Sequence, residues 1–118
     1  MKWKLPLFKT YSDKEDIKAV TKIIKRGTSW AVGPEIAEFE EKLAKYVGTK
    51  YALTFNSGTS ALHILLLAHN IKDKEVIVPS FTFVATASAV LLAGGKPVFA
   101  ESEYTTFGLD IRDVKKKI

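Results

Sequence analysis

The sequence predicts an α/β protein in which a parallel β-α-β-α-β unit follows two helices. Two observations predict this class. After residue 48, short apolar runs alternate with longer helical patterns, which is typical of parallel strands joined by right-handed crossovers. The short runs are apolar throughout rather than alternating with polar residues, as in strands of a sheet that is covered on both faces.

Residues 1–48 are expected to form a helical N-terminal arm with two helices. The first follows a predicted capping box at Ser12–Glu15, carries apolar residues at helical spacing and ends at Gly27. The second begins at Gly33-Pro34, because proline is pre-organised for the first position of a helix, and it ends at Gly48.

Residues 49–118 are expected to form the β/α unit. Apolar and β-branched runs predict three strands, at 51–55, 75–78 and 97–100. Helical patterns between and after them predict helices over 61–68, over 83–93 and from Asp110 onward. Gly94-Gly95 marks the end of the second of these helices.

Composition limits the classes of function. The chain has 118 residues, a net charge of +5 and a pI near 9.4. Its lysines are spread along the chain among acidic residues, apart from Lys115–Lys117, so solvated helix faces are favoured over nucleic-acid binding. It has no cysteine, which excludes disulfides and thiolate metal sites and fits a cytoplasmic location. The sequence predicts no metal site. It also predicts no membrane span, because the longest apolar stretch, Phe81–Ala93, is too short to cross a bilayer.

The turn Asn56–Ser60 is the clearest candidate site. It follows a predicted strand and opens a predicted helix, where free backbone N–H groups and a partial positive charge favour anions. Gly58 would let a phosphate approach the backbone, and the hydroxyls of Ser57, Thr59 and Ser60 could add hydrogen bonds. Ordinary helix capping explains the same residues, so both interpretations stay open on spacing alone. The turn has neither the Walker pattern nor the three-glycine dinucleotide pattern.

Five segments carry a resemblance to one family. The run Phe55–Leu62 resembles the NSGT-small-AL motif of the DegT/DnrJ/EryC1/StrS family of pyridoxal-phosphate-dependent sugar aminotransferases. Four more segments resemble family motifs and occur in the family's order: Trp30–Glu35, Phe39–Ala44, Val76–Thr86 and Gly94–Phe99 with Asp110. The resemblance covers essentially the whole chain from Pro6.

The resemblance implies a fold, a cofactor and site residues. Residues 1–118 would be the N-terminal part of the large domain of a fold-type-I transferase that binds pyridoxal 5'-phosphate. Thr59 and Ser60 would contact the phosphate, Gly58 would permit its approach, and Ser57 is a weaker candidate. Phe83 would stack on the cofactor ring, although a place in the core at a helix start is the alternative. Trp30 would contact the substrate sugar or, equally, anchor its own loop.

The resemblance also implies an activity and partners. The complete protein would move an amino group from glutamate or glutamine to a nucleotide-linked keto-sugar. The Schiff-base lysine and the aspartate that pairs with the cofactor nitrogen lie further downstream in family members. The chain is therefore expected to be a fragment without a catalytic residue, working as a homo-oligomer or with a complementing C-terminal half. The alternatives are a non-catalytic, phosphate-binding or self-associating remnant and, within the family, a sugar dehydratase.

Overall fold

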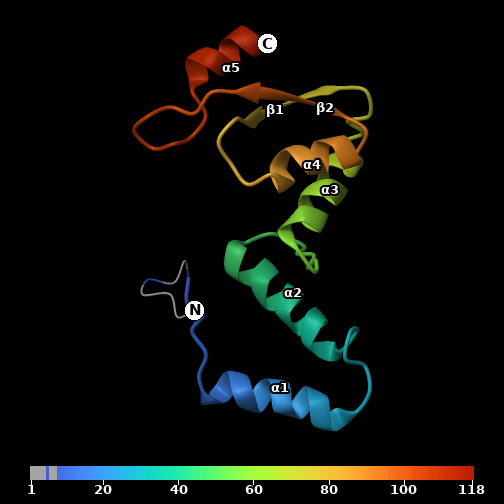
Figure 1. The fold of residues 1–118 in the computed structure, drawn as a ribbon. Helices are drawn as coiled ribbons and strands as arrows, with labels where there is room; N and C mark the ends of the chain where they lie inside the picture. The colour runs from blue at the N-terminus through green and yellow to red at the C-terminus, as the bar shows by residue number, and fades with distance from the viewer. Residues whose placement is uncertain (1–4, 6–7) are drawn as a thin grey trace. The chain divides into compact units, whose positions relative to one another are not determined.

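The computed structural model describes residue 5 and residues 8–118 of the chain (Figure 1). Pro6, at which the resemblance to the family begins, lies outside the described residues. The chain divides into two compact units, Met1–Ala52 and Leu53–Ile118. The first unit is helical, and the second contains the sheet.

The first unit contains α1 (Lys14–Arg26) and α2 (Pro34–Val47). The capping box predicted at Ser12–Glu15 is wrong by one residue, because Asp13 caps α1 and pairs with Asp16. The Asp13 carboxylate accepts hydrogen bonds from the N–H groups of Glu15 (2.8 Å) and Asp16 (3.1 Å). A charged carboxylate accepts both bonds at the positive end of the helix, and it therefore displaces the hydroxyl of Ser12 from this role.

The predicted ends of both helices are confirmed. Gly33 precedes α2, and Pro34 occupies its first turn. Gly27 and Gly48 follow α1 and α2 with φ angles of 76° and 80°. This left-handed conformation is one that glycine adopts without a steric cost, which is why each helix stops there.

The second unit contains a two-stranded parallel sheet and three helices. Its elements are α3 (Gly58–Ala68), β1 (Glu75–Pro79), α4 (Ala85–Leu92), β2 (Lys96–Ala100) and α5 (Ile111–Lys117). The two strands pair in parallel from Glu75 opposite Lys96 to Pro79 opposite Ala100. The predicted α/β class, with a helix between two parallel strands, is thus confirmed. The parallel pairing also brings the carboxyl ends of both strands to one edge of the sheet.

The strand predicted over 51–55 is wrong. These residues form no strand, and Tyr51 and Leu53 are each 74% exposed. A strand is defined by its backbone pairing, and in the described part of the chain β1 and β2 pair only with each other. The apolar run has the residue types that are common in strands, but a local run does not show whether a second strand is available to pair with it. The predicted three-stranded unit is therefore a two-stranded one.

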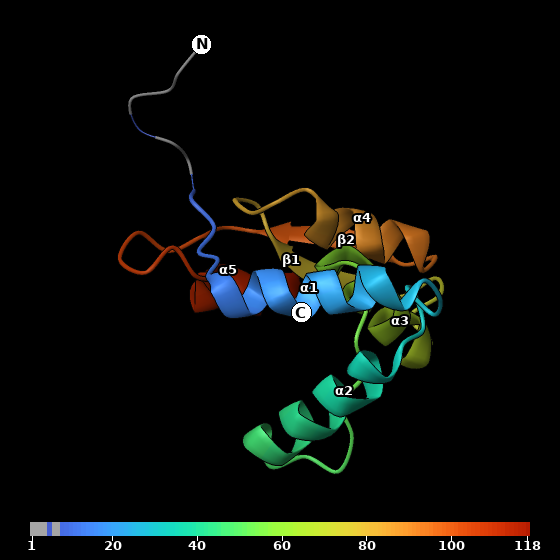
Figure 2. The same ribbon diagram turned by 90° about the horizontal axis from the view of Figure 1, so that it is seen from below.

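The core lies between the sheet and the two apolar helices. It is built from buried residues and the partly buried residues packed on them: Ile71, Val78, Val90 and Ala93 with Leu66, Val76 and Ala87. Figures 1 and 2 both show α3 beside α4, and α5 lies on the other side of the sheet from α4 (Figure 1). Gly95 has no side chain because a Cβ there would lie 2.3 Å from Cδ1 of Ile71.

Candidate functional site

The predicted phosphate turn forms the N-terminus of α3. Ser57 is the N-cap, and its Oγ accepts a hydrogen bond from the N–H of Ser60 at 3.1 Å. The two serine hydroxyl oxygens lie 3.0 Å apart, and Oγ of Ser60 donates to Oδ1 of Asn56 at 2.8 Å. Helix capping therefore occurs here, as the alternative interpretation expected. It uses Ser57 and the N–H of Ser60, and it leaves the rest of the turn for other partners.

Gly58 and Thr59 are the open part of this turn. They are the first two residues of α3, and no hydrogen bond from their N–H groups is found among the described residues. The first N–H groups of a helix have no partner within the helix, so they are available to an anion. A Cβ built on Gly58 meets no atom within 4 Å, and its φ is not positive. Neither the packing nor the backbone of this unit therefore requires glycine at position 58.

Phe83 lies in the loop between β1 and α4 and is 76% exposed. The helix predicted over 83–93 begins two residues later, at Ala85, so Phe83 lies outside the helix. The carbonyl of Phe83 accepts a hydrogen bond from the N–H of Thr86 at 3.1 Å. Its ring is not part of the core of the second unit, so a place in the core does not explain it there. An exposed ring after a parallel strand is accessible to a flat ligand.

Trp30 belongs to the other unit and lies in the loop between α1 and α2. It is 67% exposed, so within that unit it does not act as a buried anchor. The loop is held instead by Arg26, whose Nη1 lies 2.7 Å from Oε1 of Glu35. The same guanidinium donates to the carbonyl oxygens of Thr28 (3.1 Å) and Ser29 (2.8 Å). The sequence analysis missed Arg26, because no local period links a residue with its partner nine positions away.

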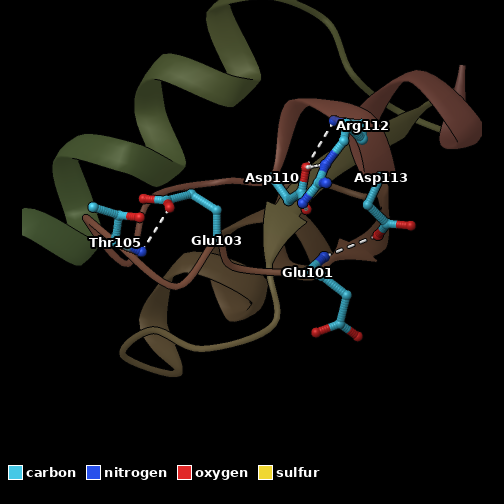
Figure 3. A network of polar contacts seen from close by, with 6 residues as sticks. All are labelled: Glu101, Glu103, Thr105, Asp110, Arg112 and Asp113. Atoms are coloured by element: carbon cyan, nitrogen blue, oxygen red, sulfur yellow. Dashed lines mark hydrogen bonds and ion pairs between the residues drawn. The ribbon is translucent and has the colours of Figure 1, made fainter.

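A second polar network, which the sequence analysis did not predict, follows β2. Figure 3 shows the Glu103 carboxylate turned toward the backbone of its own loop, where it accepts from the N–H of Thr105 at 2.7 Å. The Thr106 hydroxyl, followed by the N–H groups of Thr105 and Thr106, lowers the pKa of Glu103 to about 2. In the same view, Asp113 of α5 accepts from the N–H of Glu101 at 2.9 Å. These contacts fix the loop and attach α5 to the end of β2.

Metal binding and membrane crossing have no structural support in residues 5 and 8–118. No group of three His, Cys, Asp or Glu side chains there is placed to hold a metal ion. None of the helices in this part of the chain is both long enough and apolar enough to cross a membrane.

Comparison with known proteins decides the family. Residues 10–118 match the sequence profile of the DegT/DnrJ/EryC1/StrS aminotransferase family. The chain belongs to this family. The match includes the turn at Asn56–Ser60, the loop with Phe83 and the loop with Trp30. It confirms the family that the five sequence segments indicated.

Two curated relatives have names that refer to nucleotide-linked sugars. The chain is 41% identical over 98 residues to UDP-2-acetamido-2-deoxy-3-oxo-D-glucuronate aminotransferase of Pseudomonas aeruginosa, covering 82% of this chain and 27% of that protein. It is 45% identical over 86 residues to GDP-perosamine synthase of Caulobacter vibrioides, covering 70% of this chain and 23% of that protein. The chain thus spans about a quarter of the length of these relatives.

A solved structure shares both the fold and the cofactor of the family. The PLP-form of Spr1654 from Streptococcus pneumoniae superposes with a TM-score of 0.76 and 29% identity, covering 84% of this chain and 26% of that one. Among the described residues, those of the turn Asn56–Ser60 have chemistry suited to the phosphate of such a ligand. The turn at Gly58 offers free N–H groups and an open approach without a side chain, as the phosphate of pyridoxal phosphate requires.

Proposed function

We propose that the chain is part of a pyridoxal-phosphate-dependent aminotransferase that moves an amino group from glutamate or glutamine to a nucleotide-linked keto-sugar. The observation that carries the proposal is the family match over residues 10–118, combined with the open phosphate turn at Gly58. The named activities of the Pseudomonas aeruginosa and Caulobacter vibrioides relatives support the substrate class.

The chain's own contribution is to hold the phosphate of the cofactor. The N–H groups of Gly58 and Thr59 would donate to phosphate oxygens, together with the hydroxyl of Thr59. The hydroxyl of Ser60 would join them by turning from Oδ1 of Asn56, to which it donates in the unbound chain. Ser57 would keep the turn in shape by capping α3, as its bond to the N–H of Ser60 indicates. When bound, pyridoxal phosphate supplies an electron sink for the carbon that exchanges its amino group. The chain orients that group through its phosphate.

Two exposed aromatic residues have proposed roles in binding. Phe83 would stack on the flat pyridine ring, a contact that contributes about 0.5–1.5 kcal/mol beyond burial. Trp30 would contact the sugar of the nucleotide-linked substrate. The exposure of both rings, 76% and 67%, supports these roles, because each ring has apolar surface free for a ligand within its own unit.

The same family match supports a proposed place for the chain in the complete fold. Residues 1–118 are proposed to be the N-terminal part of the cofactor-binding large domain, with 1–48 as a helical arm and 49–118 as the β/α unit. We further propose that a second copy or a complementing C-terminal half covers the apolar faces of α3 and α4. Leu62, Leu65 and Leu91 on these helices are 40%, 57% and 61% exposed, and apolar surfaces of this kind favour association. A cytoplasmic location stays a prediction.

A chimera tests the proposed activity. The matching segment of the Pseudomonas aeruginosa aminotransferase is replaced by this chain's segment, and glutamate-dependent amination of that enzyme's keto-sugar is measured. The proposal predicts activity well above the level of a chimera that also carries Gly58→Val, since a branched side chain closes the approach to the turn.

The alternative functions predict different results. A non-catalytic remnant predicts a folded chimera that binds pyridoxamine 5'-phosphate and transfers no amino group. A dehydratase is tested instead with this chain joined to its own downstream half, whose product would have lost a hydroxyl and retained no amino group. Equal activity with and without Gly58→Val would contradict the role of the turn.

A further inference from the structure

Arg26 organises the whole loop between α1 and α2. Its guanidinium reaches the carbonyl oxygens of Thr28 at 3.1 Å and Ser29 at 2.8 Å, and it pairs with Glu35 at 2.7 Å. One planar side chain thus connects the end of α1, the loop and the first turn of α2. The guanidinium provides several donors in a fixed plane, so the three acceptors define one arrangement of the loop.

The loop is shaped around this guanidinium. A Cβ built on Gly33 would lie 2.6 Å from Nη2 of Arg26 and 2.3 Å from Oε2 of Glu35. A side chain at position 33 would therefore displace the ion pair from this geometry, and its Cβ would also lie 2.9 Å from the carbonyl oxygen of Ser29. Ser29 has a φ of 54°, a strained conformation for a residue other than glycine. Ser29 directly precedes Trp30 in the sequence, and the hydrogen bond from Arg26 to its carbonyl oxygen holds the backbone at this point.

The Arg26–Glu35 pair is less exposed than a second ion pair on α2. The side chains of Arg26 and Glu35 are 29% and 40% exposed, whereas Lys42 and Glu38 in a similar pair on α2 are 73% and 63% exposed. The hydrogen bond from Arg26 is the main cause that lowers the pKa of Glu35. Partial burial reduces screening by water, so the Arg26–Glu35 pair is screened less than the Lys42–Glu38 pair.

We propose that Arg26 is a positioning residue that fixes the loop 27–33 and so holds Trp30 in the orientation in which its ring meets the sugar of a nucleotide-sugar. Only one part of this inference, the contact between Trp30 and the sugar, rests on the proposed function. The hold of Arg26 on the loop follows from the distances above. A lysine at position 26 keeps the charge, but its single ammonium group cannot replace a planar fork that bonds three acceptors.

The first experiment measures the motion of Trp30 without any ligand. Trp3→Phe leaves Trp30 as the sole tryptophan of the chain, whose fluorescence anisotropy decay then reports on the loop. Arg26→Ala and Arg26→Lys are expected to increase the fast, nanosecond part of the decay. Lys25→Ala removes a charge from the same helical turn and is the matched control, expected to leave the decay unchanged. Circular dichroism checks that α1 and α2 persist. An unchanged decay in folded Arg26→Ala overturns the inference.

The second experiment measures the binding of UDP-N-acetylglucosamine through quenching of Trp30. In Arg26→Ala the ligand would have to order the Trp30 side chain on binding. The free-energy cost of ordering one side chain corresponds to a loss of affinity of about two- to tenfold. The affinity for pyridoxamine 5'-phosphate is expected to stay the same, since a general loss of structure would lower both. Equal sugar-nucleotide affinity in Arg26→Ala and Lys25→Ala overturns the inference. Absence of binding by the unchanged chain contradicts the proposed role of Trp30, while the anisotropy result still decides the role of Arg26.

Discussion

Replacing Gly58 with alanine separates the stability of the fold from the binding of phosphate. The added Cβ meets no atom of the unit within 4 Å, and Gly58 has no positive φ, so the folded chain accepts alanine without strain. Alanine is a better helix former than glycine, and we expect the free energy of unfolding to rise by up to about 1 kcal/mol. The same methyl group lies where a phosphate would approach the N–H groups of Gly58 and Thr59.

The expected loss of affinity follows from the hydrogen bonds that the methyl group blocks. A hydrogen bond to a charged group contributes about 1.5–3 kcal/mol, so losing one weakens binding about ten- to hundredfold. Pyridoxamine 5'-phosphate is the suitable probe, because it has no aldehyde to react with the chain's many lysines. Its dissociation constant is measured by calorimetry, and stability is measured by urea unfolding.

Gly95→Ala is the matched control at a second glycine. There the Cβ would lie 2.3 Å from Ile71 Cδ1 and 3.0 Å from Val90 Cγ1, so overpacking is expected to destabilise the core by about 1–3 kcal/mol. Its affinity for the probe, measured below its unfolding transition, should be unchanged. Two results would refute the reasoning: a destabilised Gly58→Ala, or a stable Gly58→Ala that binds the probe as tightly as the original chain.

Three further predictions concern the second unit. Val90→Ala, at a side chain 1% exposed, should lower the free energy of unfolding in urea by about 2 kcal/mol, whereas Val84→Ala, 69% exposed in the same unit, should change it little. Because the pKa of Glu103 is lowered, its ionised carboxylate stabilises the fold at pH values above 4.5, the ordinary pKa of the group, and this stabilisation is lost as the pH falls toward 2. Glu103→Gln should make the melting temperature depend less on pH over this range. Asp113→Ala should lower the helicity of α5 and the melting temperature more than Lys116→Ala, because it removes the bond to the backbone of Glu101.

Residue patterns predicted the helices well because helix signals are local. Gly27, Gly48 and Pro34 lie within one turn of the ends that they mark, and the structure has each end where the pattern expected it. Helix starts were predicted less well. The helix expected from residue 61 begins at Gly58, and the one expected from residue 83 begins at Ala85. At the start of α1, Ser12 and Asp13 are adjacent residues that both fit a capping box. Spacing does not distinguish them, whereas the charge of the carboxylate does.

Long-range features were harder to predict, since they depend on partners elsewhere in the chain. Residues 51–55 have strand composition, yet no strand of the described chain pairs with them. The contact between Arg26 and Glu35 spans a loop, and the Glu103 turn depends on backbone N–H groups that any sequence has. The phosphate turn was predictable in place but not in detail. Only the structure separates the capping role of Ser57 from the open approach at Gly58.

The proposed role of the turn Asn56–Ser60 is to hold the phosphate of the cofactor. The most direct test is a titration of the nitrogen-15-labelled chain with pyridoxamine 5'-phosphate, followed through the backbone amide signals. We expect saturable shifts that are largest at Gly58, Thr59 and Ser60, and that inorganic phosphate reproduces in part. Shifts that do not saturate, or that are largest along the lysines of α1, would contradict this role.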